Sequence, residues 1–311
     1  MKRIVILGAT GSIGIQSLDC LENLELVGFS YFNNHKLAEQ IQKRFPNAKK
    51  YSPNFLSDFS NFYEMIDVLK PDLVLNAVSS WEGLKLSIYC LENKIDLALA
   101  NKETLVIAGK FITDLAKKNN VKIIPVDSEH TTLDELMKID SKNIKSIYIT
   151  ASGGSFFNLT DKELKNINFH QAIKNPNWSM GERISVDSST LVNKCYELIE
   201  AAYLFGFDKN IKAIRHKQSL VHSIVEFKNN SMLFSVSNPD MKLAIRLALN
   251  DFKRDDCVIK QLSLNDLTLT FEEINSEKFL PIKWFNEFYL TQNFTIPPII
   301  NIANEWCFDQ F

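Results

Sequence analysis

The chain lacks a strong charge of either sign, because 35 basic and 37 acidic side chains leave a formal net charge of −2 over 311 residues. This balance predicts neither a nucleic-acid surface nor a surface for acidic membranes. Long hydrophobic runs are also missing: no apolar stretch approaches the roughly 18 residues that suggest a membrane-crossing helix. We therefore expect a protein that binds neither nucleic acid nor a membrane.

Paired cysteines and a secretion signal are likewise missing. The five cysteines are scattered and odd in number, without a CxxC pair, which predicts a reducing compartment with neither a disulfide framework nor a zinc site. The first residues, MKRIVILGA, imitate a signal peptide, but the apolar part is very short and GATGSIG follows where a cleavage region should lie. We expect residues 3–7 to form a β-strand and the protein to be cytoplasmic.

The first part of the chain alternates between two patterns. Short apolar runs such as RIVIL and DLVLNAVS are followed by helix-compatible stretches such as HKLAEQIQKRF. This alternation is typical of βαβ units with a parallel sheet. The sequence therefore predicts an α/β fold with an N-terminal, Rossmann-like doubly wound domain over residues 1–126.

After residue 126 the pattern changes to a mixture of strands and one strong helix at 189–205. This mixture predicts a central α+β domain over 127–250. The remaining residues, 251–311, are rich in Phe, Pro and Asn and are expected to form a linker and an incomplete C-terminal region. The segments with the character of strands are 144–154, 219–237 and 262–274.

The stretch GATGSIG places Gly8, Gly11 and Gly14 between a predicted strand and a predicted helix. Glycines at this place let the backbone approach a pyrophosphate at the start of the helix, so the stretch predicts a dinucleotide site. The alternative is a plain tight turn. After the second predicted strand the chain reads SYFNNHK, without the acid that usually holds the ribose of NAD. This argues for NADP, with Asn33, Asn34 and Lys36 as modest phosphate ligands; a solvated loop is the alternative.

Acidic side chains gather in PVDSEH and in the strong helix. We expect Asp127 and Glu129 to share one face of an extended segment, because alternate side chains of such a segment point the same way. Asn193, Lys194 and Glu197 share a helix face. Oxygen ligands from these carboxylates predict Mg²⁺ or Mn²⁺, and Lys194 beside the hydroxyls of Ser188 and Ser189 suits a phosphate. The alternative is a solvated helix face with Lys–Glu pairs.

These stretches together resemble the 1-deoxy-D-xylulose-5-phosphate reductoisomerase family. The resemblance rests on GATGSIG, ALANKETLV, PVDSEH, TASGG, NPNWSMGERISVDSSTLVNKCYELIEA, SLVHSIVEF and NPDMKLAI, which occur in the family's order over most of residues 4–249. It implies a homodimeric enzyme that uses NADPH and a divalent metal, with Co²⁺ as a further candidate. Such an enzyme converts 1-deoxy-D-xylulose 5-phosphate into 2-C-methyl-D-erythritol 4-phosphate in non-mevalonate isoprenoid biosynthesis. The central domain would then be catalytic, with a flap near 174–183.

The resemblance also assigns roles to individual positions. It implies metal ligation by Asp127, Glu129 and Glu197, with Lys102 also lining the catalytic site. The substrate contacts implied are Ser128, Ser152, Asn175, Trp178, Met180, Ser188, Asn193 and Lys194, of which Trp178 and Met180 are flap residues. The cofactor contacts implied are Thr10, Gly11, Ser12, Ile13, Asn101, Glu103 and Met241, beside Asn33 and Asn34.

The sequence departs from the family pattern at three places. Asn175 replaces a usual His before PNWSMG, and Phe32-Asn33-Asn34 replaces Gly-Lys/Arg-Asn after the second strand. The segment IINIANEWCFDQF resembles the family's NAANE stretch, after which a helical domain normally follows, so we expect a shortened C-terminal region.

Two other readings stay open. A reductase of the semialdehyde-dehydrogenase type needs a nucleophilic cysteine, whereas Cys195 lies on the predicted helix beside Lys194. The other reading is a degenerate, non-catalytic nucleotide-binding protein.

Overall fold

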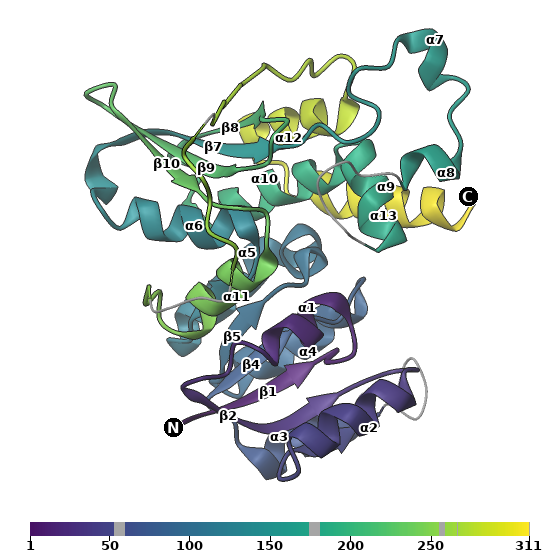
Figure 1. Cartoon of the computed structure of the whole chain (residues 1–311), viewed down its shortest axis with the longest axis vertical. Helices are drawn as coiled ribbons and strands as arrows, with labels where there is room; N and C mark the ends of the chain where they lie inside the picture. The colour runs from purple at the N-terminus through teal and green to yellow at the C-terminus, as the bar shows by residue number, and fades with distance from the viewer. Residues whose placement is uncertain (53–59, 174–180, 255–258, 266, 311) are drawn as a thin grey trace. The chain divides into compact units, whose positions relative to one another are not determined.

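The computed structural model describes most of the chain as two compact units (Figure 1). The first unit consists of Met1–Asp127 with Met241–Cys257, and the second of Ser128–Asp240 with Val258–Phe311. Asn175, Trp178 and Met180, which the sequence predicts to form the flap, lie outside the described residues. The described residues are 1–52, 60–173, 181–254, 259–265 and 267–310.

The first unit is built on a six-stranded sheet in the order β3-β2-β1-β4-β5-β6, in which neighbouring strands pair in parallel. The predicted Rossmann-like sheet is therefore confirmed. Buried aliphatic side chains of β1 and β4, among them Ile4, Ile6 and Leu75, form its core. The strands are β1 (Lys2–Leu7), β2 (Leu24–Ser30), β3 (Lys49–Tyr51), β4 (Leu73–Asn76), β5 (Asp96–Leu99) and β6 (Ile123–Pro125).

Helices alternate with these strands along the chain, as the sequence pattern predicts. Parallel pairing requires a connection that crosses back along the sheet, and these intervening helices are part of those connections. The helices of this unit are α1 (Ser12–Ser17), α2 (His35–Arg44), α3 (Ser60–Leu69), α4 (Glu82–Glu92), α5 (Lys102–Asn119) and α11 (Met241–Leu249).

Helix α11 is the point at which the observed division differs from the sequence-based one, which placed residues 241–250 in the central domain. Ile245 of α11 is fully buried in the core cluster of the first unit. Lys242 bonds Asp19 at 2.8 Å, and Arg246 bonds Glu22 at 2.6 Å. The helix thus returns to pack beside α1 (Figure 1). An amphipathic pattern shows that a helix needs an apolar partner, but not which sheet provides it.

The second unit contains a four-stranded sheet in the order β10-β9-β7-β8, in which only β7 and β8 pair in parallel. The strands are β7 (Ile144–Ala151), β8 (Asn210–Arg215), β9 (Val221–Phe227) and β10 (Met232–Val236). The helices are α6 (Ser128–Met137), η1 (Ser141–Asn143), α7 (Asp161–Leu164), α8 (Phe169–Ala172), α9 (Glu182–Ser189), α10 (Val192–Phe205), α12 (Leu280–Thr291) and α13 (Ile296–Asp309).

Two predictions for residues 251–311 were wrong. Residues 262–274 form no strand in their described part, apart from one bridge between Arg215 and Glu272. The region expected to be linker-like contains helices α12 and α13, whose prolines lie in the first helical turn. Proline is tolerated there because its missing N–H would have no partner within the helix. Phe285 and Phe288 of α12 are buried, and α12 packs against α10.

Over the described residues, we find no helix with the length and apolar character needed to cross a membrane.

Candidate active site

Helix α10 brings charged side chains into the interior of the second unit. Lys194 is 4% exposed and Glu197 is 2% exposed, so the alternative of a solvated helix face is wrong. Lys194 Nζ donates to Glu129 Oε1 at 2.8 Å and to the carboxylate of Glu197. Asn193 Nδ2 donates to Glu197 Oε1 at 2.6 Å. Side chains from α6 and α10 therefore meet in one buried polar cluster.

Charge balance explains how this cluster is tolerated. Burial by itself would lower the pKa of the Lys194 ammonium, but the adjacent carboxylates of Glu129 and Glu197 raise that pKa above its ordinary value. Lys194 is therefore charged at neutral pH, and it offsets the buried acids. A buried charge without such a partner would be very costly.

The segment after β6 differs from the predicted extended strand. β6 ends at Pro125, and Ser128 already begins α6, so Glu129 lies in the first turn of a helix. Negative charge is favourable there, because the first N–H groups of a helix point toward it. Ser128 also donates its hydroxyl to the Glu129 carboxylate. The expected convergence of acids is observed, but a strand-to-helix junction produces it.

Asp127 directly precedes Ser128 and is joined to it by a peptide bond. Its carboxylate forms an ion pair with Lys102, the first residue of α5. One oxygen each from Asp127, Glu129 and Glu197 lies within 4.8 Å of the others. Three carboxylates at this spacing fit a hard divalent cation such as Mg²⁺ or Mn²⁺, which prefers oxygen ligands.

His130 is a supporting residue of this cluster for which the sequence gives no specific signal. It is fully buried, and its Nε2 lies 2.8 Å from the backbone oxygen of Glu197. Its Nδ1 lies 3.9 Å from Glu200. The imidazole therefore braces α10 where the cluster is formed.

The TASGG stretch lies against the end of α9. Gly154 has φ +62°, and a Cβ on it would lie 2.5 Å from the backbone oxygen of Ser188. Only glycine allows this close approach, which brings the segments of Ser152 and Ser188 together. Arg215 Nε donates to the backbone oxygen of Ser152 at 3.4 Å, a contact that sequence reasoning missed. Nothing in the local sequence marks Arg215, because its partners are distant along the chain.

In the first unit, the glycine stretch forms the turn between β1 and α1. Gly8 has φ +74°, and a Cβ on Gly14 would lie 2.3 Å from the Gly8 backbone oxygen. The turn can therefore fold this tightly only with glycine at these two positions. Thr10, Gly11, Ser12 and Ile13 follow in this turn and the start of α1, where none of them is buried. This open backbone fits a pyrophosphate.

Other predicted cofactor contacts have internal hydrogen bonds. Asn101 caps α5 by accepting from Thr104 N at 2.9 Å, and its Nδ2 donates to Val78 O at 2.9 Å. Asn34 caps α2 by accepting from Leu37 N at 3.1 Å, while Asn33 is exposed. Glu103 accepts from Asn101, and Met241 packs on the core of the first unit. Contacts of these residues with a cofactor stay a prediction.

Cys195 lies on the buried side of α10 and is 0% exposed. Burial raises the pKa of its thiol far above the ordinary value. A protonated, enclosed thiol is a poor nucleophile. This position therefore argues against chemistry of the semialdehyde-dehydrogenase type at Cys195.

Family models match the chain over most of its length. The model described as 1-deoxy-D-xylulose 5-phosphate reductoisomerase matches residues 4–49 and 31–109. The model of the C-terminal domain of the same enzyme matches residues 123–205. A third model, described as DXP reductoisomerase C-terminal domain, matches residues 236–311.

Curated relatives carry the same name. The 1-deoxy-D-xylulose 5-phosphate reductoisomerase of Malacoplasma penetrans (strain HF-2) is 46% identical over 308 residues, covering 98% of this chain and 81% of the relative. That of Mycoplasmoides gallisepticum (strain R(low / passage 15 / clone 2)) is 41% identical, covering 89% of this chain and 77% of the relative. That of Clostridium botulinum (strain Loch Maree / Type A3) is 40% identical, covering 100% and 87%.

Solved structures with this name share the fold. A crystal structure of DOX-P reductoisomerase in complex with NADPH, fosmidomycin and magnesium has a TM-score of 0.84 at 28% identity, covering 98% of this chain and 89% of the other. The Zymomonas mobilis enzyme in complex with NADPH has a TM-score of 0.82 at 25% identity, covering 98% and 91%.

Proposed function

Because the chain belongs to the 1-deoxy-D-xylulose 5-phosphate reductoisomerase family, we propose that it converts 1-deoxy-D-xylulose 5-phosphate into 2-C-methyl-D-erythritol 4-phosphate with NADPH and a divalent metal. The observation that carries this proposal is the buried cluster of Glu129, Glu197 and Lys194, with Asp127 beside it. A degenerate protein without catalysis would gain nothing from such a cluster. Gathering one buried and two partly buried acids is costly unless a cation offsets their charge.

Asp127, Glu129 and Glu197 would hold the metal, since their oxygens already lie within 4.8 Å of one another. A bound Mg²⁺ or Mn²⁺ polarises the substrate carbonyl and stabilises the negative charge that develops while the carbon skeleton rearranges. Asn193 fixes one oxygen of Glu197 by a hydrogen bond of 2.6 Å, so the ligand orientation is set by the protein.

The two lysines offset the negative charge of the acids. A bound divalent cation would take over this role. Lys194 contacts Glu129 and Glu197, and Lys102 contacts Asp127. When a cation neutralises the carboxylates, these ammonium groups become available to oxygens of the substrate. This explains how Lys194 can serve as the phosphate contact that the family resemblance implies.

The phosphate of the substrate would be held by Ser152, Ser188, Asn193 and Lys194. The close approach of Gly154 to Ser188 brings two of these segments together in the second unit. Binding energy from the phosphate, which does not react, can hold the reacting end of the substrate in register.

NADPH would bind at the turn of Gly8, Gly11 and Gly14, where side chains leave the backbone open. The cofactor supplies the hydride that reduces the rearranged aldehyde. The protein contributes its placement through the β1–α1 turn. Asn33 and Lys36, which follow the end of β2, would contact the 2′-phosphate of NADPH.

We also propose that the protein is a homodimer, as the family resemblance implies. On the edge strand β10, the side chains of Met232, Phe234 and Val236 are 44%, 39% and 39% exposed. An edge strand with an exposed apolar face favours pairing with a second copy. Light scattering tests this, and a monomer at micromolar concentration would contradict it. A cytoplasmic location stays a prediction from the sequence.

The decisive assay follows NADPH oxidation driven by 1-deoxy-D-xylulose 5-phosphate, with and without EDTA. We expect oxidation with the sugar phosphate, loss with EDTA and recovery with Mg²⁺ or Mn²⁺. An aldehyde-forming acyl phosphate serves as the control substrate for the semialdehyde-dehydrogenase reading. NADPH binding without turnover of either substrate would instead support a non-catalytic protein.

A further inference from the structure

Helices α9 and α13, both in the second unit, are joined by a buried polar contact that the chemistry above does not use. Asp187 of α9 is 7% exposed, and its Oδ1 accepts a hydrogen bond of 2.9 Å from Asn304 Nδ2 of α13. Arg183, one turn earlier on α9, lies 3.6 Å from Asp187 and bonds Glu305 of α13 at 2.7 Å. Two neighbouring residues of α13, Asn304 and Glu305, thus contact one face of α9.

The place of α9 in the chain makes its polar contact with α13 relevant to substrate binding. The helix begins at Glu182 and ends at Ser189. Asp187 is followed by Ser188, a predicted phosphate contact. A shift of α9 would therefore move Ser188.

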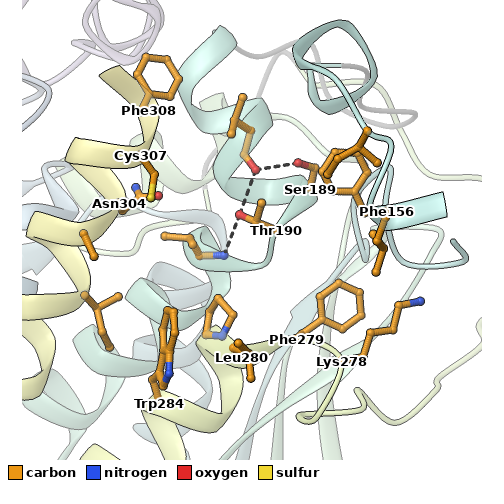
Figure 2. A pocket seen from close by; sticks show the side chains of 17 residues that line it. Phe156, Ser189, Thr190, Lys278, Phe279, Leu280, Trp284, Asn304, Cys307 and Phe308 are labelled. Carbon is orange, nitrogen blue, oxygen red and sulfur yellow. Dashed lines mark hydrogen bonds between the residues drawn. The ribbon is translucent and has the colours of Figure 1, made fainter. Parts of the chain in front are cut away.

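Helix α9 packs against α8 and α10, but its last turn also borders a cavity. A mainly apolar cavity of about 350 Å³ lies between this turn, α12 and α13, with Phe156 and Trp284 among its walls (Figure 2). The hydroxyls of Ser189 and Thr190 are bonded to the Val186 backbone oxygen at 2.7 and 3.1 Å. They turn back to their own helix and do not reach across the cavity. The polar contacts of Asp187 and Arg183 with α13 therefore link α9 to α13 beside this cavity.

The buried carboxylate strengthens this argument. Burial raises the pKa of Asp187, while Asn304 and Arg183 lower it and Glu305 raises it further. A carboxylate with so little solvent depends on its hydrogen-bond partners. The position of α9 that keeps both Asn304 and Arg183 beside the Asp187 carboxylate is therefore strongly preferred.

We propose that Asp187 and Asn304 are positioning residues for the sugar phosphate: they hold α9 against α13 as a clamp and thereby fix the position of Ser188. This inference rests on the proposed function. Neither residue touches the substrate, so their effect is transmitted through α9.

The test is Asn304→Ala in the full chain, which removes the hydrogen bond but keeps Asp187 and Arg183. We expect KM for 1-deoxy-D-xylulose 5-phosphate to rise about tenfold, the factor that corresponds to about 1.4 kcal/mol of lost binding. The inhibition constant of inorganic phosphate should rise in parallel. The value of kcat should stay within about threefold, and NADPH affinity should not change, because neither depends on Ser188.

A second pair of variants separates the clamp from a general loss of stability. Asp187→Asn keeps the oxygen that accepts from Asn304, so it should leave KM within about threefold. Asp187→Ala removes that oxygen and should reproduce the Asn304→Ala effect. If Asn304→Ala does not fold, the contrast between these two Asp187 variants decides the question.

Asn293→Ala is the matched control. Asn293 is exposed just before α13, and its side-chain oxygen accepts hydrogen bonds from Thr295 N at 3.2 Å and Thr295 Oγ1 at 2.8 Å. It should lower the melting temperature without raising KM. An unchanged KM in Asn304→Ala, or an equal rise in Asn293→Ala, overturns the clamp. Absence of turnover in the unmodified protein would instead contradict the proposed function.

Discussion

The proposed site of the first unit is formed by backbone atoms, whereas that of the second unit is formed by charged side chains. In the first unit, the proposed cofactor site is backbone: at Gly8 and Gly14 a side chain would collide with neighbouring backbone atoms. In the second unit, the site is side chains: Glu129, Lys194 and Glu197 neutralise one another out of solvent. A backbone site depends on what is missing from a few adjacent positions, whereas a charge cluster depends on residues from distant segments. The two sites should therefore fail in different ways when they are altered.

The largest effect is expected in the second unit, for Glu197→Gln. The change keeps the shape of the side chain but removes one ligand charge, so kcat should fall about a thousandfold, or about 4 kcal/mol of barrier. Folding and NADPH binding should be preserved. Glu135→Gln, on α6 but outside the cluster, is the control and should retain activity. Near-normal turnover of Glu197→Gln in Mg²⁺ would show that the carboxylate is not a ligand.

The first unit should respond to an added methyl group. A Cβ at position 14 would lie 2.3 Å from backbone, so Gly14→Ala should displace the turn and weaken NADPH binding about 100-fold. At Gly11 the nearest atom would be 3.2 Å away, so Gly11→Ala should cost much less. Fluorescence titration with NADPH measures both. Equal affinities for the two variants would contradict a backbone site.

The choice of cofactor should show a smaller effect. No acid follows β2, and Asn34 is engaged in capping α2, so only modest ligands remain for a 2′-phosphate. We expect NADPH to bind about tenfold more tightly than NADH, a difference of about 1.4 kcal/mol. Dissociation constants for both cofactors check this. Tighter binding of NADH would mean that Asn33 holds a free ribose hydroxyl.

The smallest effect concerns acid stability in the second unit. Burial lowers the pKa of His216 below its ordinary value of 6.5, although its bond to the Thr270 backbone oxygen opposes this. At acidic pH, His216 is therefore protonated more readily in the unfolded chain than in the folded one. The free energy of unfolding falls as the pH drops below about 6.5. His216→Asn can keep the bond but cannot titrate. Between pH 7.5 and 5.5, urea unfolding should show a smaller loss of unfolding free energy for this variant than for the unmodified chain. An equal loss would contradict the role of His216 in acid stability.

The difference between the units also explains what could be predicted from sequence. The parallel sheet and the glycine turn follow from local alternation and a local motif, and both are observed. The pairing of Lys194 with Glu129 joins residues far apart in sequence, so spacing alone left a solvated helix face open. Only the family resemblance favoured the cluster. Sequence patterns do not reveal the helices at 280–291 and 296–309, because prolines and asparagines are typical of linkers, although prolines also begin helices.

The most direct test of the central claim is Mn²⁺ binding, measured by calorimetry without substrate on the unmodified chain, Glu197→Gln and Glu135→Gln. The account predicts one Mn²⁺ per chain, with affinity reduced about tenfold or more by Glu197→Gln, since a charged ligand is lost. Glu135→Gln should bind Mn²⁺ as the unmodified chain does. Equal Mn²⁺ affinity in all three proteins would contradict a metal centre at Glu129 and Glu197.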